Sequence, residues 1–190
     1  MLSGSFARPV GLFDNWFNRL AAKVTGGDFC HSEFVMTWDE ETASEFFSSL
    51  EGHERLRSNY TRYLEDGEIH ICFYLLWGDT TSYRMLKRQH NNPFYRYPDG
   101  RQFELVTIQT TKEQEFKVAQ FLLNQYKKHY DYAGALSYWF PLRNSQIEYP
   151  TYFCSQQMVC ALQHIDMFKD TNPSAVTPNR LYSMIRSTGP

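Results

Sequence analysis

Residues 148–165 read Glu-Tyr-Pro-Thr-Tyr-Phe-Cys-Ser-Gln-Gln-Met-Val-Cys-Ala-Leu-Gln-His-Ile, and this stretch decides the fold that we expect. Apolar residues recur in it at helical spacing, at Met158, Leu162 and Ile165. The spacing predicts a helix whose first turn contains Cys154. Unpaired N–H groups and the positive end of the helix dipole favour a thiolate there, so Cys154 is a candidate nucleophile.

A structural role for Cys154 fits the same pattern, because free cysteine is among the most buried residue types. A catalytic role requires a base that takes the thiol proton, and histidine is the usual base because its pKa lies near neutrality. Two of the six histidines, His31 and His70, lie in predicted strands and remain candidates. The others fall at the far end of the cysteine helix or in polar and terminal segments: His53, His90, His129 and His164.

The strand that carries His31 is predicted from the alternation of side chains over residues 28–38. His31 and Glu33 project from one face of this strand, whereas Cys30 projects from the opposite face. We therefore expect Glu33 beside His31 and consider Cys30 a poor partner for the histidine. A zinc site that combines Cys30 with His31 is excluded for the same reason, and no ligand pair has the usual zinc spacing.

The length of 190 residues fits one domain, which we expect to span residues 1–190 with a core from about 12 to 185 and loose ends at 1–5 and 186–190. Four scattered cysteines, without the paired spacing of a disulfide scaffold, indicate a reducing compartment. The longest apolar run, residues 71–77, is far shorter than the ~20 residues of a membrane-spanning helix. No secretory signal is recognisable either, so a cytoplasmic protein without a transmembrane segment is expected.

The remaining elements follow from periodicity and capping signals, and together they predict an α+β protein. Thr111 and Gln114 form a capping box at the start of a long helix, and Thr177 precedes Pro178 at the start of a C-terminal helix. The other predicted elements are an amphipathic helix at 12–24, a short helix or turn at 40–50, strands at 68–77 and 103–110, a possible strand at 60–64, a short helix at 80–89 and a helix at 130–140.

Basic and aromatic residues alternate in the segment from 84 to 101. They are Arg84, Lys87, Arg88, Phe94, Tyr95, Arg96, Tyr97 and Arg101. Such a mixture can bind single-stranded nucleic acid by charge and stacking. The whole chain, however, has a formal net charge of −2 and a sequence pI of about 6.3, so we interpret the segment as a solvated loop and expect no nucleic-acid partner.

Four short motifs follow one another along the chain: Phe29-Cys30-His31-Ser32-Glu33-Phe34-Val35, Tyr130-Asp131-Tyr132-Ala133-Gly134, Tyr152-Phe153-Cys154-Ser155-Gln156-Gln157-Met158-Val159 and Pro178-Asn179-Arg180-Leu181-Tyr182. In the order of these four motifs, the chain resembles the circularly permuted branch of the NlpC-like, papain-fold cysteine hydrolases. This branch includes the YiiX-like proteins and, more distantly, lecithin retinol acyltransferase. The likeness extends from about residue 23 to residue 185.

The resemblance implies a permuted papain-like α+β fold, in which a small antiparallel sheet packs against helices and the Cys154 helix lies on the strand of His31. It implies Cys154 as nucleophile and His31 as base. The third catalytic residue in this family is a polar residue near the histidine. We select Glu33 for this position and keep His70 as the alternative. An oxyanion would be bound by the Cys154 N–H and a neighbouring donor, with the Tyr152 side chain as a weak candidate.

Relatives often carry Glu where this chain has Gln156, which leaves the nucleophile intact but removes a charge next to it. The function implied by the resemblance is a thiol hydrolase or acyltransferase that cleaves an amide (peptide or isopeptide) or ester bond through an acyl-enzyme on Cys154. Its substrate would be a peptide or a lipid acyl group, and no cofactor or metal is expected.

The competing hypothesis is a non-enzymatic structural or binding module on a papain-like scaffold. Similar proteins occur in large DNA viruses, so the resemblance is also compatible with a virion-associated location or a component of a viral particle. The partners of such an assembly are unknown from the sequence.

Overall fold

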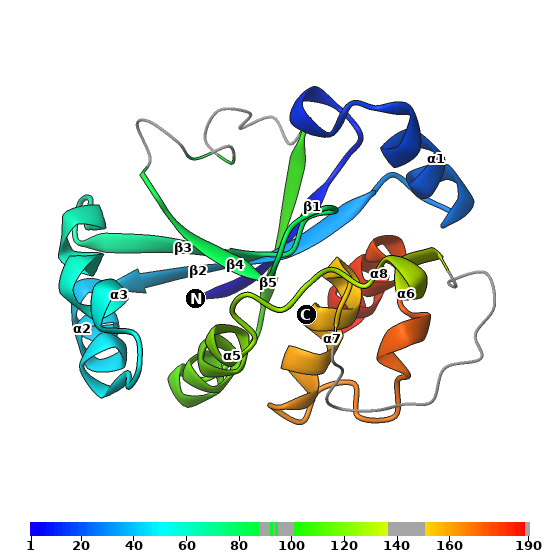
Figure 1. Ribbon diagram of the computed structural model, residues 1–190. Helices are drawn as coiled ribbons and strands as arrows, with labels where there is room; N and C mark the ends of the chain where they lie inside the picture. The colour runs from blue at the N-terminus through cyan, green and yellow to red at the C-terminus, as the bar shows by residue number, and fades with distance from the viewer. Residues whose placement is uncertain (88–91, 93, 95–100, 137–150, 189–190) are drawn as a thin grey trace.

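The computed structural model describes residues 1–190 except 88–91, 93, 95–100, 137–150 and 189–190 (Figure 1). At its centre is an antiparallel sheet with the strand order β4-β3-β2-β1-β5. Its strands are β1 (Leu2–Ala7), β2 (His31–Asp39), β3 (Glu68–Tyr74), β4 (Ser82–Leu86) and β5 (Phe103–Ile108). Within the described residues, the predicted α+β class and antiparallel sheet are confirmed.

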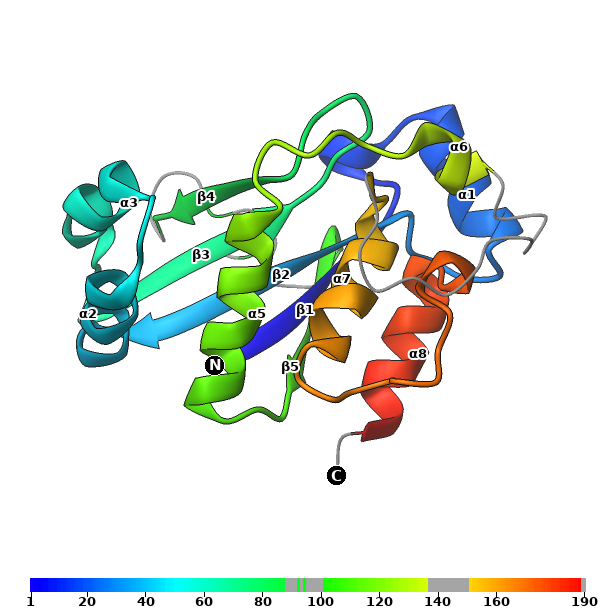
Figure 2. The same ribbon diagram turned by 60° about the horizontal axis from the view of Figure 1, so that its bottom comes forward.

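The helices gather on one face and at the two ends of the sheet. They are α1 (Trp16–Val24), α2 (Glu40–Ser49), α3 (Glu54–Asn59), α5 (Lys112–Asn124), α6 (Tyr132–Leu136), α7 (Cys154–Gln163) and α8 (Pro178–Thr188), with 3-10 turns η1 (Gly11–Phe13), η2 (Tyr60–Tyr63) and η4 (Pro173–Ala175). Figure 2 shows α5, α7 and α8 side by side across one face of the sheet. Helices α2 and α3 lie at one end of the sheet, and α1 and α6 at the other (Figures 1 and 2).

The core lies between the sheet and these helices. Large side chains of β2, such as Phe34, Met36 and Trp38, are completely or almost completely buried in it. Helix α7 packs directly on β2, so the strand that begins with His31 supports the helix that begins with Cys154. The predicted capping box of Thr111 and Gln114 is present at the start of α5.

The prediction that residues 1–5 are loose and that the core begins near residue 12 is wrong. Strand β1 runs between β2 and β5, and Leu2 and Phe6 are completely buried. A Cβ atom on Gly4 would lie 2.9 Å from the Phe6 ring and 3.3 Å from Ile185, so glycine fits this crowded position. The segment has few large apolar side chains, and only its neighbours on both sides make it a strand.

Replacing Phe6 by alanine is expected to lower the free energy of unfolding by about 3–5 kcal/mol. The reason is the cavity left where the Phe6 ring now contacts Phe29 and Tyr182, at centroid distances of 5.5 and 5.3 Å. Denaturant titration of the variant measures the loss. Leu105→Ala on β5 is the control, because this leucine is 47 % exposed and its truncation removes little buried surface. Equal stability of the two variants would contradict a core role for β1.

Two other predicted elements are wrong, and both lie at the β4 side of the sheet. The possible strand at 60–64 is the 3-10 turn η2, and the predicted helix at 80–89 contains strand β4 instead. Strand β4 forms because its backbone pairs with β3, from His70 opposite Leu86 to Tyr74 opposite Ser82. Pairing of this kind overrides a weak local preference for helix. Helix α8 continues through Thr188, so residues 186–188 are not loose.

Candidate active site

Cys154 is the first residue of α7 and is almost completely buried. The residue at the N-cap is Phe153, whose side chain accepts no hydrogen bond from the helix. The first N–H groups of α7 are therefore not occupied by a capping side chain. The N–H of Ser155 in this first turn and the N–H of Ser32 in β2 both donate to the Cys154 sulfur. These two donors favour the thiolate form.

His31 begins β2, and its ring lies against Cys154. Its imidazole stacks on the Phe13 ring of η1 with a centroid distance of 5.3 Å and an angle of 16° between the planes. On another side, His31 Nε2 lies 3.4 Å from Oε2 of Glu33, and both side chains are buried. The structure thus brings together the three residues predicted for the site: Cys154, His31 and Glu33.

The electrostatic interactions of His31 and Cys154 favour an imidazolium on His31 and a thiolate on Cys154. Burial alone would lower the pKa of His31, but hydrogen bonds and charge interactions with Cys154 and Glu33 outweigh it and raise the pKa to about 9. Burial alone would raise the pKa of Cys154. The hydrogen bond and charge of His31, together with the N–H groups of Ser32 and Ser155, outweigh it and lower the pKa below the ordinary value. At neutral pH His31 is therefore protonated, and its positive charge favours ionisation of the Cys154 thiol.

Glu33 is held within the sheet, opposite Ser5 of β1, whose hydroxyl donates to Oε1 of Glu33 at 3.5 Å. The alternative third residue, His70, lies elsewhere. Its Nδ1 lies 2.9 Å from the hydroxyl of Thr37, to which it is also paired across β2 and β3. Thr37 is six residues beyond His31 on the same strand, so His70 is not brought to the site.

The first turn of α7 is fixed by side chains that bond to residues 174–176 and to the N-cap residue Phe153. The Ser155 hydroxyl donates to the Val176 carbonyl at 2.6 Å. The amide of Gln156 donates to the Ser174 hydroxyl at 3.1 Å. The oxygen of the same amide accepts from the Phe153 N–H at 3.3 Å. A glutamate could not make this donor contact, which explains why a neutral amide suits this position.

The next side chain, Gln157, donates to the Thr81 hydroxyl at 2.8 Å and ties the helix to the start of β4. The motif around Asp131 supports the residue that precedes Phe153. The Asp131 N–H donates to the Tyr152 carbonyl at 2.7 Å, and its carboxylate accepts from the Gly134 N–H at 2.7 Å. The Tyr152 side chain is completely buried and does not line the groove described next, so it is wrongly placed for an oxyanion donor.

Cys154 lies at the bottom of a groove that extends in two directions. One part, of about 350 Å³, we call the apolar arm; it is lined by Leu20, Ala21, Val24, Ala135, Phe153 and Pro178. The other part, of about 480 Å³, we call the histidine arm; it is lined by Phe13, Asn15, Asn18, His31 and Leu76. Both arms share Phe17, Cys30, Trp77, Tyr130 and Cys154. The thiol is therefore accessible to a ligand that spans both arms.

Helix α1, the predicted amphipathic helix, lines the groove with part of its apolar face. The predicted apolar side of this helix is largely open to solvent, because Trp16, Leu20 and Val24 are 75 %, 44 % and 45 % exposed. Phe17 packs on Trp77 at a centroid distance of 4.7 Å and so joins α1 to the groove wall. The hydrophobic periodicity of α1 thus places apolar side chains in the groove next to Cys154.

The other three cysteines have environments that keep them protonated. Burial, with a smaller contribution from the charge of Cys154, raises the pKa of Cys30 to about 12. Burial raises the pKa of Cys160 to about 12 and that of Cys72 well above its ordinary value. Cys30 also lines the groove, contrary to its predicted orientation away from the site, because it precedes β2 and does not follow the alternation of the strand.

Sequence patterns did not predict several groups of the site. The N–H of Ser32 is a backbone donor and leaves no sequence signal, whereas Trp77 was visible only as the end of an apolar run. Of the basic segment, Arg88, Tyr95, Arg96 and Tyr97 lie outside the described residues, as do His90 and the predicted helical residues 137–140.

No group of three His, Cys, Asp or Glu side chains in the described parts of the chain is arranged to hold a metal ion. Among the helices described here, none is both long and apolar enough to cross a membrane. Comparisons with known protein families, curated proteins and solved structures found no match to this chain. The geometry around Cys154 is therefore the basis on which a function is assigned.

Proposed function

We propose that this protein is a cysteine hydrolase or acyltransferase of permuted papain-like fold that acts through an acyl-enzyme on Cys154. The observation that carries the proposal is the contact between His31 and a Cys154 thiol of lowered pKa, at the bottom of an accessible groove. A thiolate is the nucleophilic form of cysteine, and an adjacent histidine is its usual activating base.

In the proposed reaction, the thiolate of Cys154 attacks the carbonyl carbon of an ester or amide. The oxyanion that forms is stabilised by N–H groups at the start of α7, including that of Cys154 itself. His31 then gives its proton to the leaving alcohol or amine, and the bond to that group breaks. Because Nε2 of His31 faces Glu33, Nδ1 is the nitrogen available to the thiol. Water or another acceptor, deprotonated by His31, then attacks the thioester and releases the acyl group.

Glu33 is assigned a positioning role in this scheme. Its Oε2 lies 3.4 Å from Nε2 of His31, close enough for attraction between the charges but without a well-formed hydrogen bond, while the Phe13 ring supports one face of the imidazole. Both contacts restrict the rotation of the histidine ring, so the second nitrogen stays directed towards Cys154. Orientation of a base by a third polar group is the common arrangement of nucleophile triads.

The shape of the groove supports a substrate with an apolar acyl group. The apolar arm is lined by aliphatic and aromatic side chains from α1, α6, the N-cap of α7 and the start of α8, and its volume of about 350 Å³ falls within the range of small-molecule sites. The histidine arm contains Asn15 and Asn18 and lies on the side of His31, where the leaving group would receive its proton.

Nitrophenyl esters of acetate, octanoate and palmitate test this proposal. We expect the octanoyl ester to be cleaved with a kcat/KM at least about tenfold above the acetyl ester, since each buried methylene contributes about 0.8 kcal/mol. Mass spectrometry should detect the acyl group on the peptide that contains Cys154. Absence of both turnover and adduct with these esters and with peptide amides would leave the non-enzymatic scaffold as the better explanation.

The apolar arm is tested separately by Leu20→Asp. This half-exposed residue tolerates a polar side chain, and the variant is expected to lose the preference for the octanoyl ester while its kcat/KM for the acetyl ester stays within about twofold. Val10→Asp serves as the control, because Val10 is similarly exposed and does not line the groove. If Leu20→Asp kept the preference for the octanoyl ester over the acetyl ester, the acyl group would not bind in this arm.

A further inference from the structure

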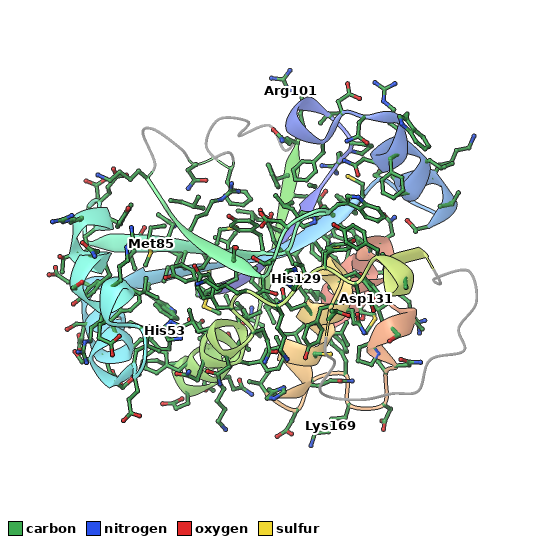
Figure 3. The ribbon with its side chains drawn as sticks, viewed as in Figure 1. His53, Met85, Arg101, His129, Asp131 and Lys169 are labelled. Carbon is green, nitrogen blue, oxygen red and sulfur yellow. The ribbon has the colours of Figure 1, made fainter. Side chains whose placement is uncertain are left out.

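A second pocket lies far from Cys154, at the opposite end of the sheet. It is formed by α3, η2 and β4 and has a volume of about 470 Å³. In Figure 1, α3 lies at the left of the molecule, whereas α1 and α6 lie at the right. Figure 3 labels Met85, which lines this pocket, and Asp131, which belongs to the candidate active site, on these two sides. The proposed hydrolysis does not use this pocket.

Three arginines from three different elements line the pocket: Arg55 of α3, Arg62 of η2 and Arg84 of β4. No described residue of its lining is acidic. Arg55 and Arg62 form no ion pair with any residue in the described part of the chain. The Nε atom of Arg84 is buried and has no hydrogen-bond partner there. The pocket thus presents positive charge that the described residues leave unneutralised.

Four tyrosine rings line the pocket beside Leu56, Asn59 and Met85, and contacts with other aromatic rings fix the positions of Tyr60 and Tyr83. Tyr60 stacks on Phe47, with a centroid distance of 4.5 Å and an angle of 23° between the planes. Tyr83 contacts Phe73 at 6.3 Å and Tyr126 at 5.4 Å. Rings that are anchored from behind in this way offer a rigid surface to a planar ligand at little cost in entropy.

We propose that this pocket binds a nucleoside phosphate. Arginine guanidinium groups match phosphate oxygens with paired hydrogen bonds, so Arg55 and Arg62 suit the phosphate chain. Nucleobases stack on aromatic side chains, which the tyrosines of the wall supply. The net charge of the whole chain is −2, so attraction of an anion arises from this local cluster and not from the overall charge.

Isothermal titration calorimetry at low salt, with adenosine triphosphate, inorganic tripolyphosphate and adenosine as ligands, tests the proposal. We expect the nucleotide to bind at least about tenfold more tightly than either of its parts, because only the nucleotide engages arginines and rings together. Added salt should weaken the binding. Lack of binding by the nucleotide, or equally tight binding of tripolyphosphate alone, would overturn the assignment to a nucleoside phosphate.

Variants locate the binding in this pocket. Arg55→Gln and Arg62→Gln alter exposed side chains, and each is expected to raise the Kd of the nucleotide by about tenfold, since each loses a charge-assisted hydrogen bond. Arg57→Gln is the matched control, because Arg57 lies exposed on the same helix but does not line the pocket. Unchanged affinity in both pocket variants would refute the site. Cys154→Ala should bind the nucleotide like the unmodified protein, since the two sites are separate.

Discussion

Replacing Cys154 by alanine is expected to lower kcat/KM for ester hydrolysis by at least about a thousandfold and to leave the fold intact. The reaction loses its nucleophile, whereas the structure loses one buried sulfur atom at the start of α7. Initial rates with the octanoyl ester measure the first effect, and thermal unfolding measures the second.

Two other cysteines provide matched controls for this variant. Cys30→Ala changes the same groove, and Cys160→Ala changes the same helix, yet both thiols have pKa values raised to about 12 and are not nucleophilic at neutral pH. Both variants should retain activity. If Cys154→Ala kept its activity while either control lost it, the assignment of the nucleophile would be wrong.

His31→Ala is expected to lower kcat/KM for ester hydrolysis by a factor comparable to that of Cys154→Ala. The thiol then has no base, and the leaving group has no acid. Groups that act as one unit give non-additive losses. The double variant that lacks both Cys154 and His31 is therefore expected to be no slower than Cys154→Ala alone.

Iodoacetamide is expected to label Cys154 selectively below neutral pH. A thiol whose pKa is lowered is still ionised at a pH where an ordinary thiol is protonated, and alkylation requires the thiolate. Cys30, Cys72 and Cys160 all have raised pKa values and should remain unlabelled. Mass spectrometry of the digested protein, after short exposures at a series of pH values, gives the rate at each cysteine.

His31→Ala should move the labelling of Cys154 to higher pH and slow it at neutral pH by at least about tenfold. Removing the imidazolium leaves burial as the main influence, and burial raises the pKa of Cys154. Slow and equal labelling of all four cysteines in the unmodified protein would show that the thiol is not activated.

Hydrolysis should also have an upper pH limit, set by His31. Its pKa is raised to about 9, so the proton needed by the leaving group is present at neutral pH and is lost as the pH rises through this value. The rate should therefore fall on the alkaline side near pH 9 and on the acidic side as the Cys154 thiolate becomes protonated.

The parts of the site that local patterns determine could be predicted from the sequence. Helical spacing placed Cys154 in a first turn, and strand alternation placed Glu33 on the face of His31. The choice between Glu33 and His70 needed the register of β2 and β3, which sets His70 opposite Thr37 and which no local pattern contains.

Strands β1 and β4 could not be predicted because their conformation depends on neighbours distant in sequence. Helix α1 illustrates another limit. Its apolar periodicity correctly predicted an amphipathic helix, but periodicity does not say what covers the apolar face, and in the structure Leu20 and Val24 face the groove.

The position of β1 between β2 and β5 has a consequence for the order in which the molecule is built during synthesis. Leu2 pairs with Ile108, so β1, which is made before the other strands of this sheet, cannot complete its pairing until residues up to β5 have been made. Helix α7, which carries Cys154, is made later still, and its first turn is then fixed by Val176. A nascent chain therefore cannot assemble the pair of His31 and Cys154 on a fixed α7 until residues up to Val176 have been translated.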